Sequence, residues 1–302
     1  MTENKTLPFD MEHVLKIIKI TPTLRECYKQ MLSKPLSHTS SIADIIISAN
    51  LNKHDIWTAS DLEAVILRLQ RFLQLLPENT LNRKHISVLS ILDTHWFRSI
   101  ATYENINDES IFPNGPLTNK FTEAASEFSL PWGRATWLDE NPYRSVITMY
   151  MPIETYPIFV IDIYLAYVFF HELGHVFSDA AYFSLYYAKK FLGIDELADK
   201  RNSYTLTLPN GDQVSGNEYV EGFASLAVKY GPFGSYTAGY SKDNDEDLWL
   251  RESFADATAA YFMGFMMYPE KDFAPLHPDV HRYIHDFYHA VATITRNSSP
   301  IK

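Results

Sequence analysis

One short segment of the chain has residues whose types and spacing could perform hydrolytic chemistry. His171 and His175 enclose Glu172 in the sequence HELGH, within an apolar pattern that predicts a helix over about 159–181. Residues four apart lie on the same face of a helix. Both imidazoles could therefore bind one zinc ion while Glu172 acts as general base toward a bound water. The apolar neighbours would bury this segment, and a metal ion would offset the cost of burying its polar groups.

A catalytic zinc ion takes a third protein ligand, and the sequence offers several carboxylates for it. No glycine or third histidine extends HELGH in the metzincin pattern, so we expect a glutamate from another helix. Glu252 has a carboxylate one turn later, Asp256, which could accept a hydrogen bond from the second nitrogen of a ligand histidine. Glu221 has Ser225 at the equivalent place. The other candidates follow the motif at a short spacing and are Asp195 and Glu196.

HELGH followed by Glu252-Ser-Phe-Ala-Asp256 resembles the gluzincin branch of zinc metallopeptidases. The strings are most similar to the catalytic domain of anthrax lethal factor and related bacterial peptidases, so the resemblance also implies a bacterial toxin or effector. It implies zinc ligation by His171, His175 and Glu252. It further implies a tyrosine that donates to the oxyanion: Tyr240 is the matching position, and Tyr236 competes with it because an acidic insertion lengthens the gap before the glutamate.

The same resemblance implies a zincin-like catalytic domain. Its small twisted sheet would lie over the motif helix, and an edge strand, expected at 145–151, would receive an extended substrate. A helical lower part would supply the glutamate. The resemblance covers only about 145–265. The segment around Glu221 resembles the ligand segment of alanyl-type aminopeptidases, which keeps a second ligand assignment open.

The remaining chain predicts an α+β protein that is mostly helical. Residues 1–115 are expected to form a helical N-terminal region of unknown role, and 116–302 the catalytic domain, because 103–120 is rich in turn-forming residues. A hairpin is expected over 204–215, turning at Asn210 and Gly211. Apolar periodicity predicts helices over about 10–20, 23–33, 40–50, 60–76, 81–101, 217–229, 246–266 and 278–295.

Composition narrows the classes of protein. With 302 residues, 46% of them hydrophobic, the chain can bury an enzyme core. One cysteine excludes a cysteine-built metal site, and a net charge of −11 disfavours nucleic acid as a partner. We expect no membrane span, because the longest apolar run is too short. A soluble protein is expected, cytoplasmic or exported without a classical signal peptide.

These observations lead to one preferred function and two alternatives. We expect a zinc-dependent endopeptidase that acts on a protein or peptide substrate, with Glu172 as general base. The first alternative is an aminopeptidase with Glu221 as third ligand, and the second is a non-catalytic binding protein on a zincin fold. A last helix carries histidines at every fourth position, whose role the sequence leaves open: His277, His281, His285 and His289.

Overall fold

A computed structural model gives the structure of the protein. It describes residues 46–50, 67–77, 88–93, 133–137, 145–151, 158–181, 201–202, 204–234, 237, 242–243, 245–266, 274–291 and 295–296. Helices contribute most of the residues in its regular elements, which confirms the expected α+β, mostly helical class. Within the described residues, no helix is both long and apolar enough to cross a bilayer.

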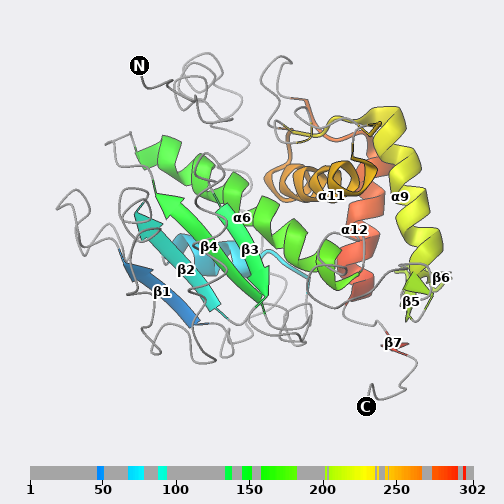
Figure 1. Ribbon diagram of the computed structural model, residues 1–302, viewed down its shortest axis with the longest axis horizontal. Helices are drawn as coiled ribbons and strands as arrows, with labels where there is room; N and C mark the ends of the chain where they lie inside the picture. The colour runs from blue at the N-terminus through cyan, green and yellow to red at the C-terminus, as the bar shows by residue number, and fades with distance from the viewer. Residues whose placement is uncertain are drawn as a thin grey trace.

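A four-stranded sheet forms one layer of the fold (Figure 1). Its strands are β1 (Ile46–Asn50), β2 (Val88–Asp93), β3 (Gly133–Trp137) and β4 (Ser145–Met151). Their order is β1-β2-β4-β3; β1, β2 and β4 run parallel, and β3 pairs antiparallel with β4. The sheet therefore presents β3 as the edge strand next to β4.

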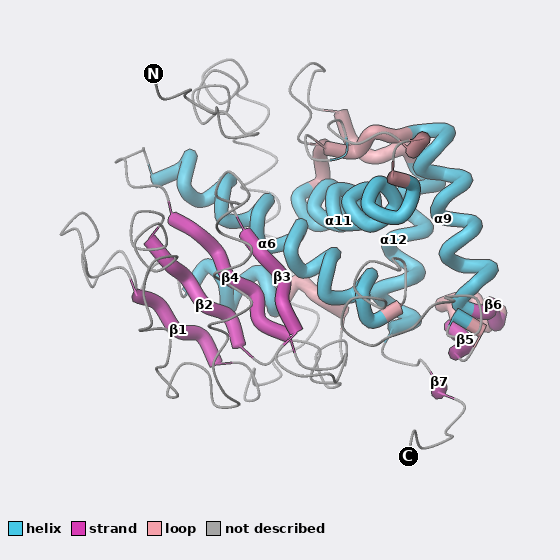
Figure 2. The backbone as a smooth tube through the Cα atoms, in the orientation of Figure 1, coloured by secondary structure: helices cyan, strands magenta, loops and turns pink. Residues whose placement is uncertain are grey.

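Helix α6 (Ile158–Ala180) is the central element of the molecule. Figures 1 and 2 show the sheet on one side of it and the helices α9, α11 and α12 on the other. All its described side chains are buried, as expected of a helix that is apolar on every face. The buried part includes the HELGH segment, so the polar groups of this segment must find partners inside the protein.

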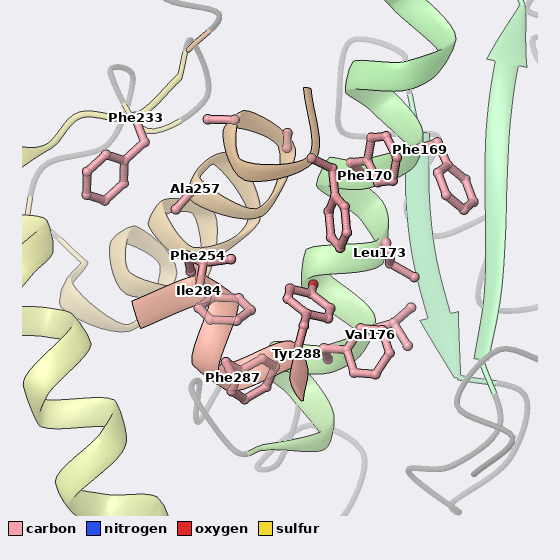
Figure 3. Close-up of a cluster of buried hydrophobic side chains, with 14 of the residues drawn as sticks. Phe169, Phe170, Leu173, Val176, Phe233, Phe254, Ala257, Ile284, Phe287 and Tyr288 are labelled. Carbon is pink, nitrogen blue, oxygen red and sulfur yellow. The ribbon is translucent and has the colours of Figure 1, made fainter. Parts of the chain in front are cut away.

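Three helices cover the other side of α6: α9 (Gly216–Tyr230), α11 (Glu246–Met263) and α12 (Pro278–Val291). Ser215 and Glu218 form a capping box at the start of α9. At the start of α11, the Asp245 side chain accepts a hydrogen bond from the backbone N–H of Leu248 at 2.9 Å. Aromatic and aliphatic side chains from α6, α11 and α12 form the core between these helices (Figure 3).

The expected hairpin is confirmed. Strands β5 (Tyr204–Thr207) and β6 (Gln213–Ser215) pair antiparallel, and β5 also pairs with β7 (Thr295–Arg296). Gly211 lies in the turn with a φ of 91°, a conformation that favours glycine. The hairpin leads directly into α9, so its register sets where that helix begins.

Several expectations for the first half of the chain need correction. The helices expected over 40–50 and 81–101 are wrong where the structure describes them, because these segments contain β1 and β2. Strands in a parallel sheet have near-continuous apolar sequences that periodicity cannot distinguish from a buried helix. Strand β1 pairs with β2 and β2 pairs with β4, so strands from both sides of residue 115 belong to one sheet.

A second correction concerns the strand at 145–151. We expected it at an edge of the sheet, but β4 lies between β2 and β3, and β3 occupies the edge. The helix expected over 60–76 is confirmed in its described part, where residues 67–73 are helical and bury Leu69, Phe72 and Leu73. The helices expected over 10–20 and 23–33 lie outside the described residues.

Candidate metal centre

Helix α6 brings the three polar residues of HELGH together in the protein interior. His171, Glu172 and His175 are 2%, 4% and 4% exposed. The centroids of the two imidazole rings are 4.6 Å apart, and each of the three residues can offer a ligand atom within 4.8 Å of the others. This is the geometry expected of histidines one helical turn apart.

Glu252 of α11 completes the cluster from the opposite side. Its Oε2 atom lies 3.2 Å from His171 Nε2 and 3.3 Å from His175 Nε2. The helices can approach so closely because Gly174 faces Ala255: a Cβ atom on Gly174 would lie only 2.6 Å from the Ala255 Cα. One carboxylate oxygen and two imidazole nitrogens therefore converge on one another.

The other carboxylate candidates differ in position. Glu221 is exposed on α9 and accepts a hydrogen bond from Asn217 Nδ2 at 2.7 Å. Asp195 and Glu196 lie outside the described residues. Of the predicted third ligands that the structure describes, Glu252 is thus the one beside the two histidines.

Glu172 belongs to the same cluster but has different contacts. Its carboxylate accepts a hydrogen bond from the backbone N–H of Ala135 in β3. A Cβ atom added to Gly133, also in β3, would lie 2.8 Å from Glu172 Oε1. The edge strand therefore lies directly against Glu172, while Glu252 is the carboxylate in closest contact with both imidazoles.

Asp256 holds the outer nitrogen of His171. Its Oδ1 atom lies 2.9 Å from His171 Nδ1 and accepts a hydrogen bond from the Tyr167 hydroxyl at 2.7 Å. Its Oδ2 atom accepts from the backbone N–H and the hydroxyl of Thr237, at 2.8 Å and 2.6 Å. When the His171 ring is neutral, the carboxylate favours the tautomer with the proton on Nδ1, and Nε2 can then bind a metal ion.

A buried ion pair fixes the second oxygen of Glu252. Arg251 donates from Nε to Asp179 Oδ1 at 2.9 Å and from Nη2 to Asp179 Oδ2 at 3.2 Å. Its remaining Nη1 atom lies 3.6 Å from Glu252 Oε1. Arg251 thus contacts the oxygen of Glu252 that the histidines do not contact, and Asp179 ties it to α6, one turn after His175.

The charges in this interior shift the protonation of its groups. Burial opposes a charge on His171, but the hydrogen bond to Asp256 and the negative charges of Asp256 and Glu252 outweigh it and raise its pKa to about 10. Burial and the positive charge of Arg251 lower the pKa of His175 to about 4. Burial by itself would raise the pKa of Glu252. The two histidines outweigh burial and hold this pKa well below the usual range.

Glu172 shows the shift that a proton acceptor needs. Burial raises its pKa to about 7, although nearby positive charge and its backbone hydrogen bond act against this. A carboxylate with a pKa near neutral pH can both take up and release a proton efficiently. Its environment thus differs from that of Glu252, whose carboxylate stays ionised.

The cluster fits a zinc ion. Glu252 Oε2 and His175 Nδ1 are buried without a hydrogen-bond partner among the described residues, and a buried orphan acceptor is costly. Two imidazole nitrogens and one carboxylate oxygen form a common donor set for zinc in hydrolases. A cation between Nε2 of both histidines and Oε2 of Glu252 would give the orphan oxygen a partner.

Four contacts of the cluster were missed by the sequence reasoning, and two of them had a local signal. Tyr167 lies one turn before His171, and Asp179 one turn after His175, so helical spacing alone places them near the motif. Arg251 and Thr237 had no such signal. The candidate oxyanion donors Tyr240 and Tyr236 lie outside the described residues.

The chain matches no protein-family model, no curated protein and no solved structure.

Proposed function

We propose that the protein is a zinc-dependent peptidase with a zincin-like catalytic domain. The observation that supports this most strongly is the convergence of His171 Nε2 and His175 Nε2 on one oxygen of Glu252, at 3.2 Å and 3.3 Å. The three residues supply the donor set of a catalytic zinc site that keeps a position open for water. When bound, zinc would lower the pKa of that water to about 7 and polarise the substrate carbonyl.

Glu172 has the contacts required of a general base. It is a neighbour of both ligand histidines, and its raised pKa suits a group that takes a proton from water and later gives it to the leaving amine. Its hydrogen bond to Ala135 holds the carboxylate toward β3. Because the proton acceptor and the ligand Glu252 come from different helices, each carboxylate is held separately for its own task.

The sheet offers a way to hold the substrate beside this base. Strand β3 lies at the edge next to β4 and contacts Glu172 through Gly133 and Ala135. A peptide that adds to such an edge as a further strand is held by backbone hydrogen bonds along its length. This arrangement favours an endopeptidase that acts on an extended segment, with the role expected for 145–151 transferred to 133–137.

The aminopeptidase alternative loses its main support. It depended on Glu221 as third ligand, and that side chain is exposed on α9 and hydrogen-bonded to Asn217. Against the alternative of a non-catalytic binding protein stands Glu172, a buried carboxylate beside both histidines whose pKa burial raises to about 7, since shifted ionisable groups cluster at functional sites.

Peptide cleavage provides the test. An unstructured protein such as casein and a peptide library in N-acetylated and free-amine forms are incubated with zinc-loaded wild type, Glu172→Gln and, as matched control, Glu221→Gln. New internal termini, detected by mass spectrometry, are expected with the wild type and with Glu221→Gln, and a loss of about 100-fold or more with Glu172→Gln. Cleavage only of peptides with a free amino terminus would support the aminopeptidase instead. No cleavage by the zinc-loaded wild type would overturn the peptidase proposal.

A further inference from the structure

Helix α12 and the residue before it carry a second group of histidines that the proposed function does not use. His277, His281, His285 and His289 follow one another at intervals of four residues. The opposite face of the helix is buried against the core through apolar side chains. The histidines therefore lie on the outer side of α12, where His281 and His289 are exposed and His285 is partly exposed.

The surroundings of these histidines separate them into different environments. The ring of His277 is stacked on Tyr230 at a centroid distance of 3.7 Å, and its Nδ1 accepts a hydrogen bond from the backbone N–H of Asp279. The ring of His281 lies 4.9 Å from that of Tyr261. His277 is thus engaged with an aromatic ring and with its own helix start.

His285 and His289 instead approach each other. Their ring centroids are 4.2 Å apart, which is similar to the 4.6 Å between His171 and His175. Both pairs have the same spacing along a helix, which brings two imidazoles within reach of one ion.

We propose that His285 and His289 form a second, solvent-facing site for a divalent transition-metal ion. Asp286 lies 3.0 Å from His285 Nδ1, so it can hold the proton there and leave Nε2 for the ion. Two imidazoles suit Zn²⁺ and Cu²⁺, with Cu²⁺ bound more tightly.

This site differs from the buried centre in the number of its protein ligands. In the buried centre, His171 and His175 lie with two carboxylates, Glu172 and Glu252, whose oxygens are within metal-ligand spacing of the imidazoles. The pair on α12 supplies two ligands, and water completes the coordination. An ion with fewer protein ligands and open access to solvent binds more weakly and exchanges more readily, so the two sites are separable by affinity.

Titration of the full chain with Zn²⁺ alone tests the proposal. Isothermal calorimetry of the wild type should show one weakly bound zinc ion per chain, called here the weak equivalent. It should bind independently of any ion in the buried centre. His285→Gln and His289→Gln should each weaken it at least about 10-fold, since each removes one of two ligands. His277→Gln is the matched control, because it removes the histidine just before α12 that is stacked on Tyr230, and it should leave the weak equivalent unchanged.

A ring-specific measurement separates ligation from a structural effect on α12. On addition of Zn²⁺, the imidazole Cε1–H signals of His285 and His289 should shift together in NMR spectra, and that of His277 should not. The proposal is overturned if the wild type has no weak equivalent, if the equivalent persists in His289→Gln, or if it is lost in His277→Gln. The weak equivalent can be measured whether or not the buried centre binds zinc. The experiment therefore tests the α12 site independently of the proposed peptidase site.

Discussion

Asp256→Asn is a sharp test of how the proposed metal centre is built, because the substitution changes chemistry with almost no change of shape. The carboxylate is fully buried and accepts two hydrogen bonds at each oxygen. An amide has one acceptor oxygen and one donor nitrogen. In either orientation of the amide, its nitrogen takes the place of an oxygen that accepts two hydrogen bonds in the wild type.

Each orientation has a specific cost. If the amide nitrogen faces His171, that ring must place its proton on Nε2, the atom that the metal ion needs. If it faces Thr237, the backbone N–H there meets another donor and loses its partner. An unsatisfied buried group costs about 1–3 kcal/mol. Loss of the outer-shell partner of a ligand histidine commonly lowers metal affinity by about 10- to 100-fold.

We therefore expect Asp256→Asn to lower zinc affinity by about 10- to 100-fold and to destabilise the metal-free protein by about 1–3 kcal/mol. Competition with a chromophoric chelator measures the first effect, and denaturant unfolding of the metal-free protein measures the second. Thr237→Val is the control: it removes the 2.6 Å hydroxyl bond but keeps the backbone donor and His171, so zinc affinity should change little. Zinc affinity of Asp256→Asn within about twofold of the wild type would refute this account of the tautomer.

Three further predictions concern ligands, protons and turnover. Glu252→Ala should lower zinc affinity in a chelator competition far more than Glu221→Ala, and the reverse order would move the third ligand to α9. In the metal-free protein the pKa of His171 is about 10, because its carboxylate partners outweigh burial. Zinc binding at neutral pH should therefore release a proton, and zinc affinity should increase about 10-fold for each unit by which the pH is raised. Calorimetry in buffers of different ionisation enthalpy counts the released proton. Tyr240→Phe should reduce turnover on a peptide substrate by about 2.7–4 kcal/mol with zinc affinity unchanged, and an equal loss only in Tyr236→Phe would name that residue as the oxyanion donor.

The parts of the centre that depend on local spacing were accessible to sequence reasoning. Histidines one turn apart on an apolar helix must share a face, so the pairing of His171 and His175 follows from the chain itself. Glu252 was preferred over Glu221 because Asp256 follows it by one turn, and the structure does bring Asp256 to His171 Nδ1. The hydrogen-bonding needs of a proposed ligand histidine were thus a usable signal for a contact between residues far apart in sequence.

The sheet was harder to predict for a physical reason. The apolar runs around Ile46–Asn50 and Val88–Asp93 are stabilised as strands by pairing with segments far along the chain, which the local sequence does not reveal. For the same reason β3 was missed as the edge strand beside Glu172, although Gly133 leaves just enough space for that side chain. The hydrogen bonds of Thr237 to Asp256 likewise depend on tertiary structure alone.

The most direct test of the central claim is the zinc content of purified, dialysed protein, measured by mass spectrometry for the wild type, Glu172→Gln and His175→Ala. Dialysis removes any ion held by the exposed pair on α12. Since Glu172 is proposed to act on water and His175 on the metal ion, the account predicts about one zinc ion per chain in the wild type and in Glu172→Gln, and almost none in His175→Ala. A full complement of zinc in His175→Ala, or no zinc in the wild type after it is offered the metal, would contradict the account.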